Sequence, residues 1–192
     1  MLRTDVKSPF LDGQLLIAAP GMTDPRFAEA VVLVCTHSDN GAMGVVVNRP
    51  ANGVRFADIV EQLDVGKPDI VPDIPLRVGG PVERSRGFVL HSPDYDQPEA
   101  TVKVTDWCSL TGHVEVLRAL VDRTGPADAL LALGYSNWAS DQLEGELRDG
   151  SWLVLEADRE LVFATPRTAL WSICLDRIGV DPAMLHRVAG SA

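Results

Sequence analysis

The chain has 192 residues, of which 46% are hydrophobic and 23% are charged, and its formal net charge at pH 7 is -10. This balance is typical of a globular protein, and the length suits a single domain. Nucleic-acid binding depends on lysine and arginine side chains that neutralise phosphates. So acidic a chain, without a basic run, is therefore a poor candidate for direct DNA or RNA binding, and its charge also opposes adsorption to anionic membranes.

The compartment can be predicted from apolar runs and cysteines. No stretch approaches the roughly 20 apolar residues of a membrane helix. The N-terminus, MLRTDVKSPFLDG, lacks the apolar core of a signal peptide. Cys35, Cys108 and Cys174 are odd in number and lie in or beside apolar sequence, so we expect buried, reduced thiols. We therefore expect a cytoplasmic protein with one domain over residues 1–192, in which residues 1–13 form a flexible N-terminal segment.

Apolar runs in the first quarter of the chain predict three strands, at Gln14–Ala19, Ala30–Cys35 and Ala42–Asn48. The second run is continuous and β-branched, as in a strand covered on both faces. Asp39-Asn40-Gly41 is a strong turn signal, so we expect the second and third strands to form a hairpin.

Helical spacing begins at Arg55–Leu63, where Phe56, Ile59, Val60 and Leu63 recur at i, i+3, i+4 and i+7. Short apolar runs then predict further strands at Leu76–Val78, Gly87–His91, Thr101–Thr105 and Ala129–Leu133.

The second half of the chain contains three more helical patterns. The first two cover Ser109–Arg123 and Trp138–Leu147, the latter with Asn137 as its N-cap. The last helix starts at Pro166 with Thr165 as its cap. Between them, Trp152–Leu155 and Leu161–Ala164 flank a turn and predict a hairpin.

This order of elements is a mixed α/β chain of the α+β type, without regular βαβ alternation. We expect one domain with a largely antiparallel or branched sheet and helices packed against it.

Candidate site residues gather around two strands that end alike. VVLVCTHS closes on His37-Ser38, and GFVLHS closes on His91-Ser92. If these strands lie side by side and point the same way, the two imidazoles meet at one sheet edge, where Asn48 could join them. Gly79-Gly80 would let another group approach the backbone closely and could offer N–H groups to an anion, with Arg84 and Arg86 adding charge.

Simpler interpretations of the same residues remain open. Gly79-Gly80-Pro81 is also typical of a tight passage between packed elements, and a histidine at a strand end often only hydrogen-bonds a loop carbonyl. No group of cysteines and histidines has the spacing of a zinc site. The chain contains no G-x-S-x-G elbow and no glycine-rich phosphate-binding motif, so we expect no metal and no cofactor.

Five segments together resemble a known family. They are LLIAAPGMTDPRF, VCTHSDNGAMGVVVNRP, VGGPVERSRGFVLH, LGYSNWASDQLEGEL and the ending RVAGSA. In this order they are similar to the AlgH/YqgE family of bacterial proteins. The resemblance implies a single α/β domain with a bifurcated, partly barrel-like sheet surrounded by helices. The family is often labelled a transcriptional regulator, a label that fits poorly with the charge of -10 and the missing DNA-reading motif.

The resemblance also implies which residues carry the family's motifs. They are His37, Gly41, Met43, Gly44, Asn48, Pro50, Gly79, Gly80, Pro81, Arg86, Gly87, His91, Gly134, Trp138, Gln142, Leu143 and Glu144. The family often ends in Gly-His-Ala, whereas this chain ends in Gly190-Ser191-Ala192, so any role of a C-terminal histidine would have to pass to His186.

Our leading hypothesis is a non-enzymatic ligand- or protein-binding regulatory module that influences transcription indirectly. Its site would be a cleft formed by His37, Asn48, Gly79, Gly80 and His91, with Arg86 nearby, and its ligand a small anion. The first alternative is a hydrolase or transferase that uses His37 or His91 as general base, with a hydroxyl or activated water in reach. The second is a protein-interaction scaffold.

Overall fold

The computed structural model describes residues 9–66 and 70–181. Within these ranges nine strands form one sheet, ordered β6-β7-β5-β8-β3-β2-β1-β9, with β4 paired to β8 beside this path. The strands are β1 (Gln14–Ala18), β2 (Val31–Ser38), β3 (Gly41–Val46), β4 (Leu76–Val78), β5 (Val82–His91), β6 (Thr101–Lys103), β7 (Ser109–Thr111), β8 (Ala129–Ala139) and β9 (Trp152–Glu156).

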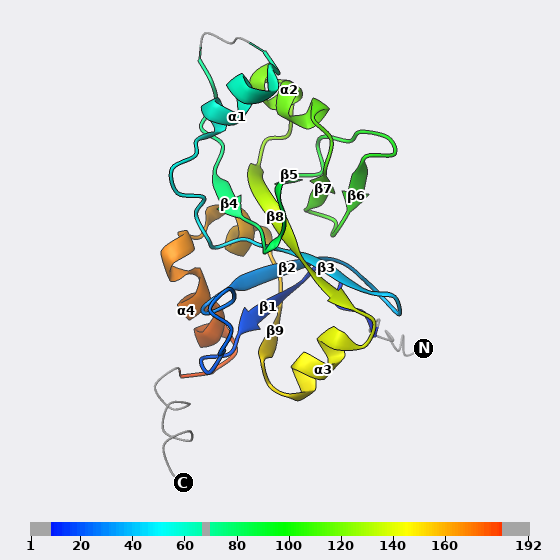
Figure 1. The fold of residues 1–192 in the computed structure, drawn as a ribbon, viewed down its shortest axis with the longest axis vertical. Coiled ribbons are helices and arrows are strands. Elements are labelled where there is room, and N and C mark those ends of the chain that lie inside the picture. The colour runs from blue at the N-terminus through cyan, green and yellow to red at the C-terminus, as the bar shows by residue number, and fades with distance from the viewer. Residues whose placement is uncertain (1–8, 67–69, 182–192) are drawn as a thin grey trace, which may run out of the picture.

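Strand β8 is the point where the sheet forks. Along Leu131–Leu133 it pairs with antiparallel β5 on one edge and with parallel β4 on the other. Further along, Ser136 to Ala139 pair with β3 instead. The sheet therefore divides into a half built on β4–β7 and a curled antiparallel half built on β1–β3 and β9, which Figure 1 shows above and below the crossing. The prediction of a mixed, bifurcated, partly barrel-like sheet in an α+β chain is confirmed.

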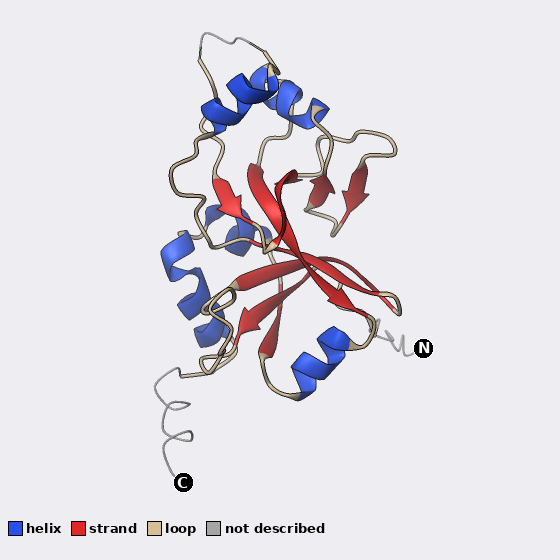
Figure 2. Cartoon of the chain, in the orientation of Figure 1, coloured by secondary structure: helices blue, strands red, loops and turns tan. Residues whose placement is uncertain are grey.

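Helices cover both halves (Figure 2). Helices α1 (Phe56–Leu63) and α2 (Glu115–Val121) lie over the half built on β4–β7, and α4 (Arg167–Arg177) lies beside β1 and β2. Helix α3 (Gln142–Arg148) lies at the far end of β8. No helix among the described residues is both long and apolar enough to span a membrane.

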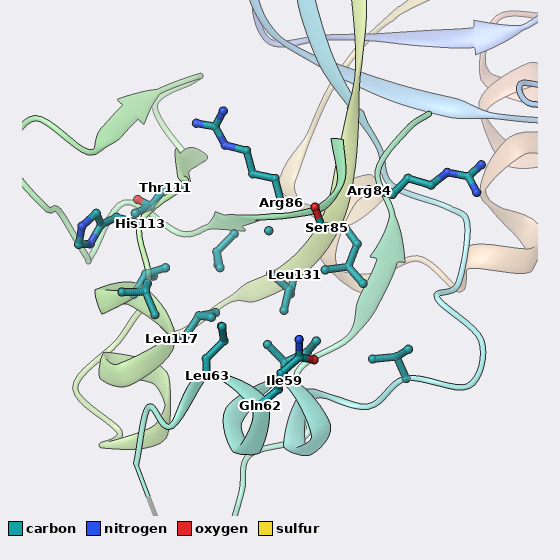
Figure 3. A pocket seen from close by; sticks show the side chains of 17 residues that line it. Ile59, Gln62, Leu63, Arg84, Ser85, Arg86, Thr111, His113, Leu117 and Leu131 are labelled. Carbon is teal, nitrogen blue, oxygen red and sulfur yellow. The ribbon is translucent and has the colours of Figure 1, made fainter. Parts of the chain in front are cut away.

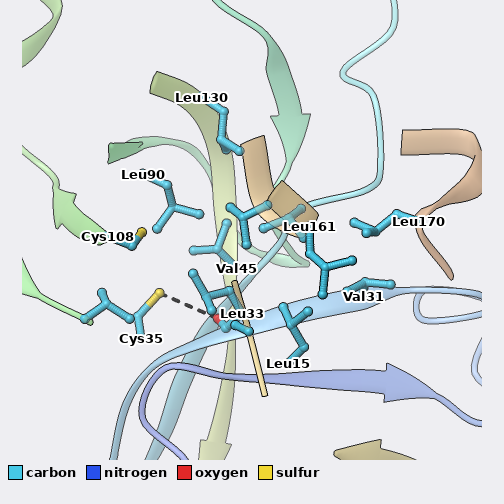
Figure 4. Close-up of a cluster of buried hydrophobic side chains, with 14 of the residues drawn as sticks. Leu15, Val31, Leu33, Cys35, Val45, Leu90, Cys108, Leu130, Leu161 and Leu170 are labelled. Carbon is cyan, nitrogen blue, oxygen red and sulfur yellow. Dashed lines mark hydrogen bonds between the residues drawn. The ribbon is translucent and has the colours of Figure 1, made fainter. Parts of the chain in front are cut away.

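The buried hydrophobic side chains of the described residues form three clusters, and Figure 4 shows one of them. Leu15, Leu33 and Leu161 are fully buried there. All three cysteines belong to the same cluster, and each is free and buried, as predicted. Burial raises the pKa of Cys108 to about 12 and that of Cys174 to about 11, so both thiols stay protonated at neutral pH.

Most predicted strands, the β2–β3 hairpin and helix α1 are confirmed. The helix predicted over Ser109–Arg123 is wrong in its first part, because Ser109–Thr111 forms β7 and pairs with β5 and β6. The helix predicted over Trp138–Leu147 is wrong at its start, and Asn137 is not a cap. Both Asn137 and Trp138 belong to β8, which runs on to pair with β3.

Two further expectations near the C-terminus are corrected. The predicted hairpin is wrong: β9 pairs with β1, and Glu160–Ala164 forms a π-helical turn packed into the core. Thr165 does not cap α4, whose N-cap is Pro166; the Thr165 hydroxyl donates to the Glu160 carbonyl instead. The expectations for residues 1–8 and for His186 to Ala192 lie outside the described residues.

Candidate functional site

The structure does not bring the two predicted histidines together. His37 pairs with Ala42, which pairs with Trp138 of β8, whereas His91 pairs with Ala129 at the other end of β8. Nine residues of strand span about 30 Å. Strands β3 and β8 lie between β2 and β5, and the three successive pairings are all antiparallel. Strands β2 and β5 therefore run in opposite directions, and they finish near opposite ends of β8. The prediction of a common cleft for His37 and His91 is therefore wrong.

His37 fastens the N-terminal residues and α3 to the end of β2. Its Nδ1 accepts the main-chain N–H of Leu11 at 3.0 Å, which places the ring proton on Nε2, 2.8 Å from Glu144 Oε1. The main-chain N–H of His37 donates to Asp12 at 2.8 Å. The main-chain N–H of Glu144, and also the His37 imidazole, hold the pKa of the Glu144 carboxyl below its usual value. Residues 11 and 12, which we expected to be flexible, are thus bonded to β2.

His91 is fully buried and part of a hydrogen-bonded chain. Its Nδ1 lies 2.8 Å from the Ser92 carbonyl, which can only accept, so Nδ1 carries the proton. Nε2 then accepts from the Thr111 hydroxyl at 2.9 Å, and Thr111 lies 2.7 Å from Thr101 Oγ1. Burial lowers the pKa of His91, because the charged imidazolium is poorly solvated in this position.

This buried imidazole should make stability depend on pH. Because the pKa of His91 in the folded protein lies below its ordinary value of 6.5, the unfolded chain takes up the proton first as pH falls. The stability contributed by neutral His91 is complete above pH 6.5 and is lost as the pH falls towards the folded pKa. Urea unfolding between about pH 7.5 and 5 should show this loss for the wild type and a flatter profile for His91→Gln. A steep profile that His91→Gln leaves unchanged, while exposed His113→Gln flattens it, would contradict this assignment.

The Gly79-Gly80 pair lies at the fork of the sheet. The Gly79 N–H donates to the Leu133 carbonyl of β8, and its carbonyl accepts the Val46 N–H, both at 2.8 Å. A Cβ at Gly80 would overlap the carbonyl of Tyr135. Both glycines are buried against β8, so the Gly79 N–H is not available to an anion and the interpretation as a tight passage holds.

Asn48 and Arg86 also lie apart from the histidines. The Asn48 side chain accepts the Val31 N–H at 2.9 Å and donates to the Glu29 carbonyl at 2.8 Å, so it clamps the loop before β2. Arg86 lies on β5 beside a cavity that the sequence did not predict. Its guanidinium is 3.2 Å from Glu83 and stacks over the Phe88 ring at 4.9 Å.

This cavity, of about 400 Å³, opens between α1, α2 and the sheet (Figure 3). Its apolar lining comes from four elements. Ile59 and Leu63 belong to α1, Val116 and Leu117 to α2, Val89 to β5, and Leu131 and Leu133 to β8. We call it the α1–α2 groove. Its rim leaves apolar surface in contact with solvent: the exposed fractions are 48% for Leu63 and 37% each for Val54 and Val114.

Polar groups lie at the border of the α1–α2 groove. Ser85 lines the groove from β5, as Gly87 and Val89 do. Gln62 contributes from α1, and His113 from the loop before α2. Arg84 and Arg86 border the groove, but Figure 3 shows their side chains directed away from Leu117 and Leu131.

The sequence shows the apolar stripes that line the α1–α2 groove, but not that part of the α1 stripe stays exposed. Leu63 ends the apolar stripe of α1, and a stripe residue is expected to be buried, yet about half of it is exposed. Leu117 lies on the equivalent stripe of α2. The four elements are distant in sequence, so neither the groove nor the roles of Ser85 and His113 could be derived from spacing alone.

The fold and groove define a single-domain α+β protein with a forked sheet and an apolar cavity under two helices. The chain matches the AlgH-like family model over residues 15–183. It is 48% identical over 190 residues to a UPF0301 protein of Methylobacterium nodulans, covering 95% of this chain and 90% of the relative. The chain belongs to the AlgH-like family, as the resemblance of its motifs indicated.

Solved structures agree with this assignment. The solution structure of the AlgH protein from Pseudomonas aeruginosa matches with a TM-score of 0.75 and 39% identity, covering 96% of this chain and 98% of that one. A crystal structure of a protein from Corynebacterium diphtheriae matches with a TM-score of 0.71, covering 91% and 90% of the two chains; at 21% identity it supports the fold alone.

Proposed function

We propose that the protein is a non-enzymatic regulatory module that binds one small amphipathic anion, such as a medium-chain carboxylate, in the α1–α2 groove. The observation that carries this proposal is an apolar cavity of about 400 Å³ with polar groups at its border. Small-molecule sites commonly measure about 300 to 1,000 Å³ and combine an apolar lining with a few polar groups.

The lining favours an apolar body for the ligand. Leu63, Leu117 and Leu131 offer aliphatic surface from three elements, and the exposed part of Leu63 would be removed from water by a bound chain. Each buried methylene contributes about 0.8 kcal/mol of transfer free energy.

The rim favours an anionic head group. The Arg84 side chain makes no ion pair or hydrogen bond with another described residue, and Arg86 has one ion-pair partner among the described residues, the exposed Glu83. The Ser85 hydroxyl and the Gln62 amide add hydrogen-bonding groups on the same border. Both arginine side chains are exposed, so an anion at this border can draw on their positive charge in a protein whose overall net charge is -10.

A regulatory role fits the groove better than a catalytic one. His113 is the imidazole of the groove, and its Nδ1 lies 3.4 Å from both the Gln97 amide and the Glu115 N–H. Within the described part of the chain it makes no hydrogen bond to Ser85 or Thr111, the hydroxyl residues of the lining. We place this module in the cytoplasm, which three free, buried thiols support, and any effect on transcription would pass through the bound ligand or a protein partner.

Calorimetric titration of the full chain with decanoate and with decanol tests this function. We expect saturable binding of one decanoate per chain, weaker binding of decanol because it lacks the charge, and displacement of anilinonaphthalene sulfonate by decanoate. Absence of decanoate binding, or many weak sites without saturation, would refute the proposal.

One observation favours the second candidate, a hydrolase or transferase with His91 as general base. Thr111 Oγ1 lies 2.9 Å from His91 Nε2, and the Ser92 carbonyl orients the ring, as in a nucleophile–base–orienter arrangement. Both side chains are fully buried, so a substrate could reach them only after β7 moved from β5. Ester hydrolysis that is present in the wild type and lost in Thr111→Val would support this candidate over the binding module.

A further inference from the structure

A second cavity, of about 310 Å³, lies on the other half of the molecule, at the start of α4. Arg167, Thr168 and Trp171 line it from α4, and Asn48 and Arg49 line it from the segment after β3. Ala28, Glu29 and Ser172 complete the lining. We call it the α4 cavity; it shares no lining residue with the α1–α2 groove.

Arginines without an acidic partner gather here. Arg49 donates to the carbonyls of Ala28 and Pro25, at 2.8 and 3.4 Å, and forms no ion pair among the described residues. The Arg167 side chain is exposed and makes neither a hydrogen bond nor an ion pair with any residue that the structure describes. Other arginines of this acidic chain do have carboxylate partners, among them Arg26, Arg159 and Arg177.

A third guanidinium increases the local positive charge. Arg77 is half-buried and donates to the carbonyls of Val47 and Leu76, at 2.9 and 3.1 Å. Burial, and also the like charge of Arg167, lower the pKa of Arg77. An anion between Arg49 and Arg167 would relieve this repulsion. Glu29 is the acidic residue of the lining, and its charge opposes such an anion.

The other walls suit a ligand that carries a ring or apolar part beside the anion. Trp171 is partly exposed, and its Nε1 donates to the Ala18 carbonyl at 2.8 Å, which fixes the indole in place. The Thr168 hydroxyl lies in the first turn of α4, whose cap residue, Pro166, provides no side-chain acceptor. Hydrogen-bond donors from Arg49, Arg167 and Thr168 and the fixed indole of Trp171 therefore border the same cavity.

We propose that the α4 cavity is a binding site for a small organic phosphate, whose phosphate group is held by Arg49 and Arg167 and whose organic part contacts Trp171. Arginine forms paired, charge-assisted hydrogen bonds with phosphate oxygens, which is the geometry that two guanidinium groups in a small cavity can supply. This site is independent of the α1–α2 groove, and either can fail without the other.

Calorimetric titration of the full chain with AMP, adenosine and inorganic phosphate tests the site. AMP should bind, with an affinity that falls as salt is added, and adenosine should not bind measurably, because it lacks the phosphate. Arg167→Gln should weaken AMP binding at least about tenfold, since it removes a hydrogen bond between charged groups. Glu29→Gln should strengthen AMP binding by removing a like charge.

Two matched variants distinguish AMP binding in the α4 cavity from electrostatic attraction of AMP to the protein as a whole. Arg148→Gln and Glu61→Gln make the same charge changes at exposed positions in α3 and α1, and both should leave AMP binding unchanged. The proposal is overturned if AMP does not bind, if Arg167→Gln binds it as well as the wild type does, or if Arg148→Gln weakens binding equally. Inorganic phosphate binding as tightly as AMP would overturn the contact assigned to Trp171.

Discussion

Gly80→Ala should destabilise the protein by at least about 3 kcal/mol, a large effect for a single methyl group. The added Cβ would overlap the main-chain carbonyl of Tyr135 in β8. This carbonyl cannot move away as the end of a flexible side chain could. Relief would require β8 to move away from the Gly79-Gly80 segment. That movement would break the hydrogen bonds by which Gly79 joins Val46 to Leu133, which connect the two halves of the sheet in addition to β8 itself.

Gly21→Ala is the matched control for this prediction. A Cβ at Gly21 would meet nothing within 4 Å, so the same chemical change should alter stability by less than about 0.5 kcal/mol. Urea unfolding followed by circular dichroism measures both variants. Equal midpoints for Gly80→Ala and Gly21→Ala would show that the fork tolerates a side chain and would contradict the packing described.

Ser85→Trp should abolish decanoate binding while leaving the fold intact. Ser85 is exposed and borders the α1–α2 groove beside Gly87 and Val89, so an indole at this position can lie over the apolar lining that the ligand needs. The new ring would bury its own apolar surface there, so we expect stability within about 0.5 kcal/mol of the wild type. The affinity for decanoate should fall at least about tenfold, equivalent to 1.4 kcal/mol.

Thr36→Trp provides the control for the added tryptophan. Thr36 is an exposed position of β2 and does not line the α1–α2 groove, so this variant should bind decanoate as the wild type does. Calorimetric titration compares the three proteins. Undiminished binding in Ser85→Trp, or an equal loss in Thr36→Trp, would show that decanoate binds elsewhere.

The fold was largely predictable because local signals agreed with tertiary packing. The continuous apolar run of β2, the turn at Asp39-Asn40-Gly41 and the spacing of Phe56, Val60 and Leu63 all specify the elements observed. The family resemblance supplied the forked sheet. The order of strands around β8, by contrast, depends on contacts between segments that are distant along the chain.

The incorrect elements share one physical cause. Short apolar runs fit a strand or a helix equally well until their partners are known. Leu110 continued the stripe of α2, but pairing with β5 made it part of a strand. Trp138 was the first residue of the helix predicted over Trp138–Leu147, but pairing with β3 makes it part of β8. Leu161 was predicted to lie in a strand, but it packs into the hydrophobic core as part of a π-helical turn.

The candidate site was less predictable than the fold. Motif residues such as Gly80, His91 and Asn48 were found from the sequence, and the structure gives them packing and hydrogen-bonding contacts. Their grouping into one cleft required β2 and β5 to be parallel neighbours, which the sheet order excludes. Arg84, Arg86 and Gly87 lie beside the α1–α2 groove, and Asn48 lines the α4 cavity.

The measurement that tests the central claim most directly is methyl NMR of the full chain during titration with decanoate. The account predicts saturable shifts of the Ile59, Leu63, Leu117 and Leu131 methyl groups, which line the α1–α2 groove, with unchanged signals from Leu153 and Val154 in β9. Shifts centred on β9, or no shifts at concentrations that saturate other carboxylate-binding proteins, would contradict it.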